Sequence, residues 1–485
     1  MSHGIIPGSN SHACMQLQSS SSAPLLKTCL SLFFPLAFSM ISSSTVGIVD
    51  MYLASFLGNR AQAAVGLGDQ LLFLLMVIGS GLATACGSFV SRSAGAAMPE
   101  HCRHYAAASL YIGGAIGIFS TILSIFWAAD FLKFLGASGN LLSESSSYVI
   151  YTSLGNPSFI VLLCLSSIFR SLAKTRQAVY LWLLCAAVSN ALSLSAFFSP
   201  FQSFHCLNAL AFGWDIGVSV ALIFGIQQFK KILKELPKQV REQQPAAIQF
   251  RKYCSELLQL AMPAVLAELG LLLSQFLFYR LLFELNPDQT LQAAWTVKLK
   301  LEETLAMIPL LALGMSAAVI VGHKSGAGKT QEAKSDCLKI AKYAAIFLLL
   351  PGLVLSVSAN SLAPLFSQDG LTQKSTSLLL EPSVFSLPLC AFSTILCSGL
   401  DAAGKTIAPM TLNLIFQVLI KYALAHFLAI DLKMDLSGIN LAVCLSQLLM
   451  TASVLCYFMK QELASELLPG AALRMQAGSE AVFKR

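Results

Sequence analysis

One apolar run near the start of the chain, residues 25–57, is too long for the core of a soluble protein. At about 1.5 Å of rise per residue, a helix over this run crosses a hydrocarbon layer of about 30 Å with length to spare. Pro35 removes a backbone hydrogen bond and predicts a hinge point inside the helix. Asp50 places an acid there, and such an acid is costly to bury unless it faces an aqueous cavity. Asp50 is therefore the first candidate for a residue that exchanges a proton or a cation; the alternative is a side chain that reaches the interface from near the helix end.

The composition of the chain leaves no polar shell for a soluble protein. Of its 485 residues, 56% are hydrophobic and only 11% are charged, which is typical of a chain with many membrane-spanning segments. Eleven more apolar segments follow the first, and together they predict an all-α polytopic membrane protein with about twelve transmembrane helices. These segments lie at residues 63–90, 105–131, 148–169, 178–198, 206–229, 254–283, 291–321, 338–359, 377–400, 407–430 and 436–459.

Basic residues are concentrated in alternate loops rather than in one patch, and the formal net charge is +7. The loops after the even-numbered segments carry most of them, including Arg170 and Lys174. By the positive-inside rule these loops and both termini are cytoplasmic. We therefore expect a multi-pass protein of a bacterial inner (plasma) membrane, surrounded by lipid and without a nucleic-acid partner. Residues 1–24 are expected to form a disordered cytoplasmic tail, and residues 460–485 a second cytoplasmic tail.

The chain also repeats itself at a shift of about 231 residues. The repeat predicts two six-helix lobes of the same orientation, residues 25–229 and 253–459, joined by a cytoplasmic linker at residues 230–252. Two such lobes are related by a pseudo-two-fold axis along the membrane normal, and the central cleft between them suits alternating access. The matching pairs are 166–178 with 397–409, 89–96 with 320–327, Pro157 with Pro388 and, at nearly the same shift, Pro35 with Pro263.

Several patterns that would suggest a soluble enzyme fit a membrane protein better. GLDAAGKT at residues 399–406 satisfies the phosphate-loop pattern, but it follows an apolar helix instead of a buried strand, so we expect a turn between helices. His323, His205 and the pair His101 and His104 are expected to be surface or loop residues. The thirteen cysteines are expected to be small core residues. No paired catalytic groups and no metal-ligand spacing point to an enzyme or a metal site.

A set of short motifs, in order and duplicated, resembles the multidrug and toxic compound extrusion (MATE) transporters, within the superfamily that includes lipid-linked oligosaccharide flippases. The resemblance implies two helical bundles in a V and export of cationic or amphipathic organic compounds in exchange for protons or sodium. It implies a monomer without a cofactor other than a bound sodium ion, if sodium is the coupling ion. The motifs are the segment 35–58 with Val49–Asp50, GSGLATACGSFVSRSAGA ending at Ala96, FRSLAKT at 169–175 and AAVIVGHKSGAG at 317–328.

The resemblance implies a coupling site in the first lobe. It supports Asp50 as the coupling acid and Asn190 as its neighbour, and Asp215 in the sixth span is the nearest further acid. Asp215 is a candidate member of the site or, alternatively, an interfacial or cavity-lining residue. Family members with a full sodium site have a second acid one turn after that asparagine, where this chain has Leu194. We therefore favour a proton, which needs only one carboxylate in an apolar pocket, over sodium, which needs several oxygen ligands.

The expected substrate cleft is bordered by Pro35, Gln70, Glu268 and Lys300. Glu268 is an acid in an apolar stretch five residues after Pro263, and it is expected to face the cleft. The main prediction is thus a proton- or sodium-coupled antiporter that exports organic or drug-like compounds. The alternative within the superfamily is a lipid-linked oligosaccharide flippase, whose cleft would need several cations for a pyrophosphate. Lys298 and Lys300 are the main candidates for that role.

Overall fold

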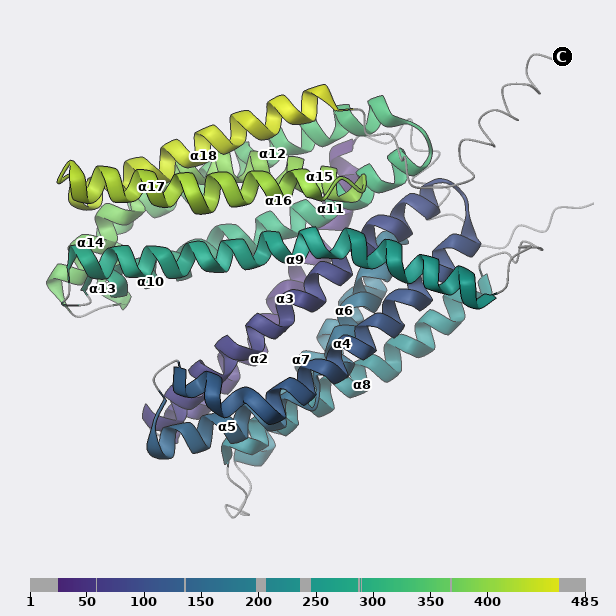
Figure 1. Ribbon diagram of the computed structural model, residues 1–485, viewed down its shortest axis with the longest axis horizontal. Helices are drawn as coiled ribbons and strands as arrows, with labels where there is room; N and C mark the ends of the chain where they lie inside the picture. The colour runs from purple at the N-terminus through teal and green to yellow at the C-terminus, as the bar shows by residue number, and fades with distance from the viewer. Residues whose placement is uncertain are drawn as a thin grey trace, which may run out of the picture.

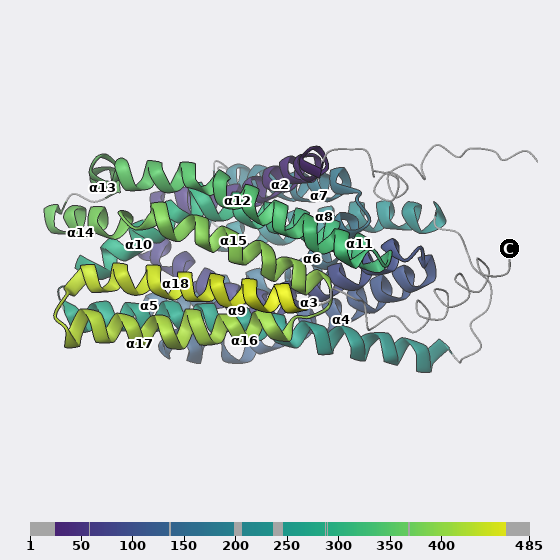
Figure 2. The same cartoon turned by 90° about the horizontal axis from the view of Figure 1, so that it is seen from above.

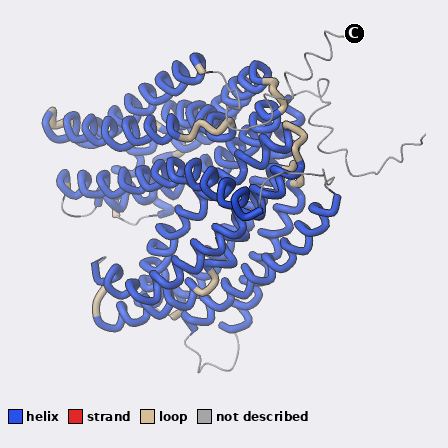
Figure 3. Tube along the Cα trace, turned by 45° about the vertical axis from the view of Figure 1, so that its right-hand side comes forward, coloured by secondary structure: helices blue, strands red, loops and turns tan. Residues whose placement is uncertain are grey.

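The computed structural model describes residues 25–461 apart from residues 58, 135–136, 198–205, 236–245, 287, 289 and 367–368. The expected N-terminal tail, most of the C-terminal tail and the middle of the expected linker lie outside the described residues. Figure 3 shows the described residues as long helices joined by short loops. Eleven of these helices are long and apolar enough to cross a membrane, or twelve if one bent helix pair counts as a single span. The predicted all-α polytopic fold with about twelve spans is confirmed.

The first lobe consists of α2 to α8. Its fourth span is broken, because α5 and α6 meet at an angle of 50°. Pro157 lies in the first turn of α6, where its missing N–H does not interrupt a helical hydrogen bond. The helices are α2 (Leu25–Phe56), α3 (Asn59–Gly95), α4 (Pro99–Phe134), α5 (Gly139–Ser153), α6 (Asn156–Ser171), α7 (Thr175–Phe197) and α8 (Cys206–Glu235).

The second lobe consists of α9 to α18. Asp369 caps the start of α14 by accepting hydrogen bonds from the hydroxyl and the backbone N–H of Thr372, which lowers the pKa of this carboxyl group outside the membrane-spanning helices. The α-helices are α9 (Ala246–Leu285), α10 (Thr290–Glu302), α11 (Ile308–Gly326), α12 (Thr330–Val357), α13 (Ala359–Phe366), α14 (Gly370–Leu380), α15 (Ser383–Ala402), α16 (Ile407–Asn413), α17 (Lys421–His426) and α18 (Asp435–Lys460). Three π-helical stretches interrupt them, namely η1 (Glu303–Met307), η2 (Leu414–Ile420) and η3 (Phe427–Asp431). Figure 2 shows α16 and α17 along α9, with α18 packed against α15 and α17.

The two lobes form a V in Figure 1. They diverge at the end that carries α5 in one lobe and α13 and α14 in the other, which we call the open side. They converge at the opposite end, where α3 packs against both α9 and α11, and we call this the closed side. The polar cavities described below lie between these two ends.

The first helix of each half packs against both lobes. Leu32 and Leu36, in the first part of α2, pack in the core of the second lobe, whereas Leu53 near its end packs in the first lobe. In the same way, Leu257 of α9 packs in the core of the first lobe and Leu281 in the second. The hydrophobic cores therefore interlock across the boundary between the two halves of the sequence.

The closed side contains two turns that repeat with the sequence. Ala97 after α3 and Gly328 after α11 both have positive φ, at 53° and 78°. Ala173 after α6 and Gly404 after α15 also form such a pair, at 58° and 84°. Each pair has the same pattern of backbone hydrogen bonds, shifted by 231 residues. The sequence GLDAAGKT is thus a turn between two helices, as predicted, and its conformation is the one that closes a helix C-terminus.

The histidines differ in part from the prediction. His323 is only 5% exposed, and its Nε2 atom donates to the carbonyl oxygen of Ser171 at 2.6 Å. The prediction of a surface or loop residue is wrong for His323, because the crossing of α3 and α11 covers the end of α11. His101 and His104 are half-buried against Tyr253, and His205 lies outside the described residues.

Candidate functional site

A cavity of about 580 Å³ lies on the side of the first lobe that faces the cleft. Its wall is partly aromatic, with Phe159, Trp182 and Trp214 among its residues. Apolar residues such as Leu72 and Met76 alternate with hydroxyl-bearing ones such as Ser43 and Thr152, and a cavity that combines apolar surface with placed polar groups is typical of a site for small organic molecules. Four charged residues reach this cavity, and three of them are acids: Asp50, Asp69, Arg170 and Glu303.

Asp50 is the most buried acid of this cavity, at 6% exposed. The hydroxyl of Ser193 on α7 donates to its Oδ1 atom at 3.0 Å. Ser193 is held there because α7 and α8 pack closely, and a Cβ atom on Gly213 of α8 would come within 2.8 Å of the serine hydroxyl oxygen. The glycine therefore lets α8 press Ser193 toward α2. The site thus presents one buried carboxyl group with one neutral donor, next to a cavity.

Asn190 lies beside a different residue of α2. Its Nδ2 atom donates to the hydroxyl of Thr45 at 3.2 Å, and its Oδ1 atom has no hydrogen-bond partner among the described residues. Asp215 lies against Gly155 at the break between α5 and α6. It is not among the residues that line the first-lobe cavity, although its neighbour Trp214 is. The structure therefore brings Asp50 together with Ser193, and it places Asn190 and Asp215 at separate points around it.

A second acid lies on the cavity wall. Asp69 of α3 accepts a hydrogen bond from the Tyr148 hydroxyl at 3.1 Å and is exposed to the cavity. Gln70 is also exposed. Lys300 is exposed, pairs with Glu303 at 2.8 Å and lies outside the residues that line either cavity. Pro35 is half-buried in α2, next to Leu36, which packs on the second lobe.

A second cavity, of about 430 Å³, faces the second lobe. Glu268 of α9 lines it and accepts a hydrogen bond from Ser80 of α3, so this acid links the two lobes. Asp401 at the end of α15 also lines this cavity. Basic residues line another part of it, and these are Lys298 and Lys421.

Several of these residues were not proposed from the sequence. Ser193 and Tyr148 carry no signal of their own, because a hydroxyl in an apolar helix is common and its partner depends on packing. Asp401 and Lys421 do carry one, since each is an ionisable residue in or next to an apolar run, the same signal that singled out Asp50. Among the described residues, no group of three or more His, Cys, Asp or Glu side chains is placed to hold a metal ion.

An all-helical chain with membrane-length helices, two interlocked lobes and a polar cavity on each is a membrane transporter by its architecture. The family model described as MatE matches residues 35–194 and 263–427, and the chain belongs to this family. Its members are transporters and not enzymes.

Known relatives cover most of the chain. An FAD transporter of Shewanella oneidensis is 26% identical over 457 residues, which is 91% of this chain and 96% of the relative. The multidrug export protein MepA of Staphylococcus aureus is 21% identical over 394 residues, which is 79% of this chain and 83% of the relative.

Solved structures show the same fold. A crystal structure of MATE in the bent conformation matches with a TM-score of 0.81 and 16% identity, covering 92% of this chain and 96% of that chain. A structure described as the outward-facing conformation of a multidrug resistance MATE family transporter also matches with a TM-score of 0.81, at 16% identity, covering 92% of this chain and 97% of that one.

Proposed function

We propose that this transporter is a cation-coupled antiporter that exports organic compounds by alternating access, with Asp50 as the coupling acid. The observation that carries the proposal is the position of Asp50, a buried carboxyl group at the wall of a cavity of about 580 Å³ that opens to the cleft. An acid in a membrane-spanning helix is retained at a cost in stability, and it is typical of a proton or ion pathway.

The oxygen atoms near Asp50 favour a proton over sodium as the coupling ion. Sodium needs several hard oxygen ligands at once. Ser193 supplies a hydroxyl to Asp50, whereas Asn190 is turned toward Thr45 and Asp215 lies against Gly155. A proton needs only the carboxylate itself.

Coupling requires that the proton and the substrate favour different arrangements of the two lobes. A ligand shifts a conformational equilibrium only by the difference in its affinity for the two states. In the arrangement described here the lobes are apart on the open side and in contact on the closed side. We place the closed side at the cytoplasm because the basic turns after α6 and α11 lie there, so the cleft opens outward.

This orientation has a direct test by cysteine labelling in a cysteine-free background. Lys329 lies in the turn after α11 on the closed side, and Lys374 lies in α14 on the open side; both are exposed. A membrane-impermeant thiol reagent added to intact cells should label Lys374→Cys and spare Lys329→Cys. Labelling of Lys329→Cys but not of Lys374→Cys would show that the closed side faces outward.

The substrates are proposed to be organic compounds, since the relatives are called a multidrug export protein and an FAD transporter. The aromatic wall of the first-lobe cavity suits such molecules. A flippase for lipid-linked oligosaccharides is the weaker candidate, because its pyrophosphate would need several cations and the two lysines expected to hold it are both neutralised: Lys298 pairs with Glu302 and Lys300 with Glu303.

The experiment that tests this function is transport by purified protein in liposomes. Export of a fluorescent drug-like compound should follow an imposed proton gradient and should not follow a sodium gradient. Export under a sodium gradient alone would identify sodium as the coupling ion. Equal movement without any gradient would exclude an antiporter.

A further inference from the structure

The two cavities carry opposite charges on their sides toward the open end. The first-lobe cavity presents the acids Asp50 and Asp69. The second-lobe cavity presents a cluster from two helices, made of Trp295, Lys298 and Glu302 on α10 and Lys421 at the start of α17. We call these four residues the basic cluster.

One of the two lysines in the basic cluster is neutralised. The Nζ atom of Lys298 lies 2.7 Å from the Oε2 atom of Glu302, and both side chains are buried. The other carboxylate oxygen of Glu302, Oε1, accepts a hydrogen bond from the Ser383 hydroxyl at 2.8 Å. Both oxygens of Glu302 are therefore engaged, and its charge is matched by Lys298.

Lys421 is the second cation, and it has no such partner. It makes no ion pair with a described residue, and its Nζ atom lies 4.5 Å from the ring centre of Phe278 and 6.0 Å from that of Trp295. The two rings are stacked with centroids 5.1 Å apart. Aromatic faces hold an ammonium group in place but do not neutralise it. The indole N–H of Trp295 also lacks a hydrogen-bond partner among the described residues.

The remaining acids of the cavity are too far along the helices to compensate Lys421. Glu268 lies on the same continuous helix as Phe278, ten residues earlier, which corresponds to a distance of about 15 Å along the axis. Glu268 is engaged with Ser80 of α3, toward the closed side. Asp401 lies at the end of α15, at the turn that belongs to the closed side.

We propose that Lys421 binds the carboxylate or phosphate group of an amphipathic organic anion, whose apolar part occupies the second-lobe cavity. The wall beside the basic cluster is apolar enough for this, with Leu299, Met307 and Leu311. Lys421 follows the π-helical stretch η2, and Glu302 precedes η1; such wide turns are frequent at functional sites. This inference rests on the proposed export of organic compounds, and it assigns one substrate class to the cavity that does not contain Asp50.

The test is binding of matched neutral and anionic probes to the purified full-length protein, measured by titration calorimetry. Flavin mononucleotide and riboflavin differ by one phosphate, and 1-naphthoate and 1-naphthamide differ by a carboxylate. The parent protein should bind the anion of at least one pair more tightly than its neutral partner. Which pair shows the preference distinguishes phosphate from carboxylate recognition.

The variants separate charge from size. Lys421→Met should weaken binding of the preferred anion about tenfold and leave the neutral partner unchanged, and Lys421→Arg should stay within about threefold of the parent. Lys421→Gln replaces the methionine variant if that protein does not fold. The matched control is Lys374→Met, which removes an exposed charge on α14 at the same end of the lobe and should bind like the parent.

Three results would overturn the inference: no anion preference in the parent protein, an equal loss of both members of a pair in Lys421→Met, or an equal loss in Lys374→Met. Failure here is distinct from failure of the proposed function. Binding to purified protein needs no gradient, whereas the coupling role of Asp50 is read from gradient-driven export of a neutral or cationic compound.

Discussion

Gly95 and Gly326 occupy equivalent positions in the two halves of the chain, and each packs against the helix of the other where α3 crosses α11. A Cβ atom on Gly95 would meet the backbone of His323, and one on Gly326 would meet the backbone of Arg92. His323 and Arg92 are themselves equivalent under the shift of 231 residues. The pseudo-two-fold axis therefore passes through a contact that only glycine permits, and this contact holds the closed side together.

The first prediction concerns this glycine contact. Gly95→Ala and Gly326→Ala should each force α3 and α11 apart and lower the stability of the closed-side arrangement by about 1–3 kcal/mol. The free energy of unfolding in detergent measures the effect. Gly66→Ala on the same helix α3 is the control, because its Cβ atom would meet nothing within 4 Å. Alanine there should be neutral or stabilising by up to about 1 kcal/mol, and an equal loss in all three variants would refute the contact.

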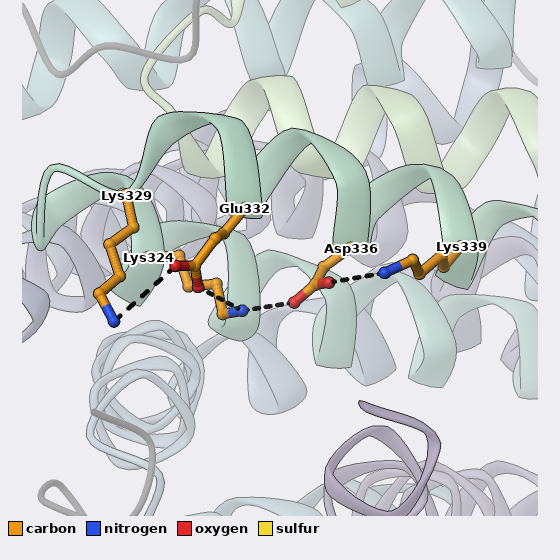
Figure 4. Close-up of polar contacts among 5 residues, drawn as sticks. All are labelled: Lys324, Lys329, Glu332, Asp336 and Lys339. Atoms are coloured by element: carbon orange, nitrogen blue, oxygen red, sulfur yellow. Dashed lines mark hydrogen bonds and ion pairs between the residues drawn. The ribbon is translucent and has the colours of Figure 1, made fainter. Parts of the chain in front are cut away.

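The second prediction concerns an ion-pair network at the turn between α11 and α12 (Figure 4). Lys324 lies 2.6 Å from Asp336, whose side chain is only 11% exposed. Lys324→Met should lower the free energy of unfolding by about 1.5–3 kcal/mol, since it removes a charged hydrogen-bond donor from a mostly buried acid. Lys329 lies 4.0 Å from Glu332 and is about half exposed. Lys329→Met should therefore change stability by less than about 1 kcal/mol; an equal loss from both variants would contradict this ranking.

The third prediction concerns the turn that imitates a phosphate loop. The Nζ atom of Lys405 donates to the side chain of Gln461 at 2.7 Å, and the turn follows helix α15 instead of a strand. Lys405→Ala should leave transport nearly intact, and the purified protein should not hydrolyse ATP. Magnesium-dependent ATP binding that is lost in Lys405→Ala would show that the turn has a nucleotide role after all.

The helices and their duplication follow from the sequence because both depend on local patterns. Long apolar runs predict spans, and matched segments 231 residues apart predict two halves. The interlocking of α2 and α9 does not follow, since nothing in either run shows which lobe its first turns will contact. The same limit applies to His323, whose burial results from the crossing of α3 and α11.

The candidate site also has one part that local sequence patterns predict and another part that depends on how the helices pack. Asp50 could be selected from the sequence because a buried acid is unusual in an apolar helix. Its contact with Ser193 could not, because it depends on how closely α7 packs against α8 at Gly213. Lys421 gives the same kind of signal as Asp50, because it is an ionisable residue in an apolar run. That Lys298 has an ion-pair partner and Lys421 has none among the described residues depends on packing, so it could not be predicted.

Gradient-driven export by Asp50→Asn tests the central claim most directly. Asparagine preserves the size of the side chain and can still accept from Ser193, but it cannot exchange a proton, so the variant should mimic one protonation state permanently. Asp130→Asn is the control, because the Asp130 side chain is 71% exposed. In liposomes with an imposed proton gradient, the parent and Asp130→Asn should export substrate, whereas Asp50→Asn should bind substrate but export it no faster than protein-free liposomes. Export against the gradient at the parent rate by Asp50→Asn, present at the same level, would contradict the account.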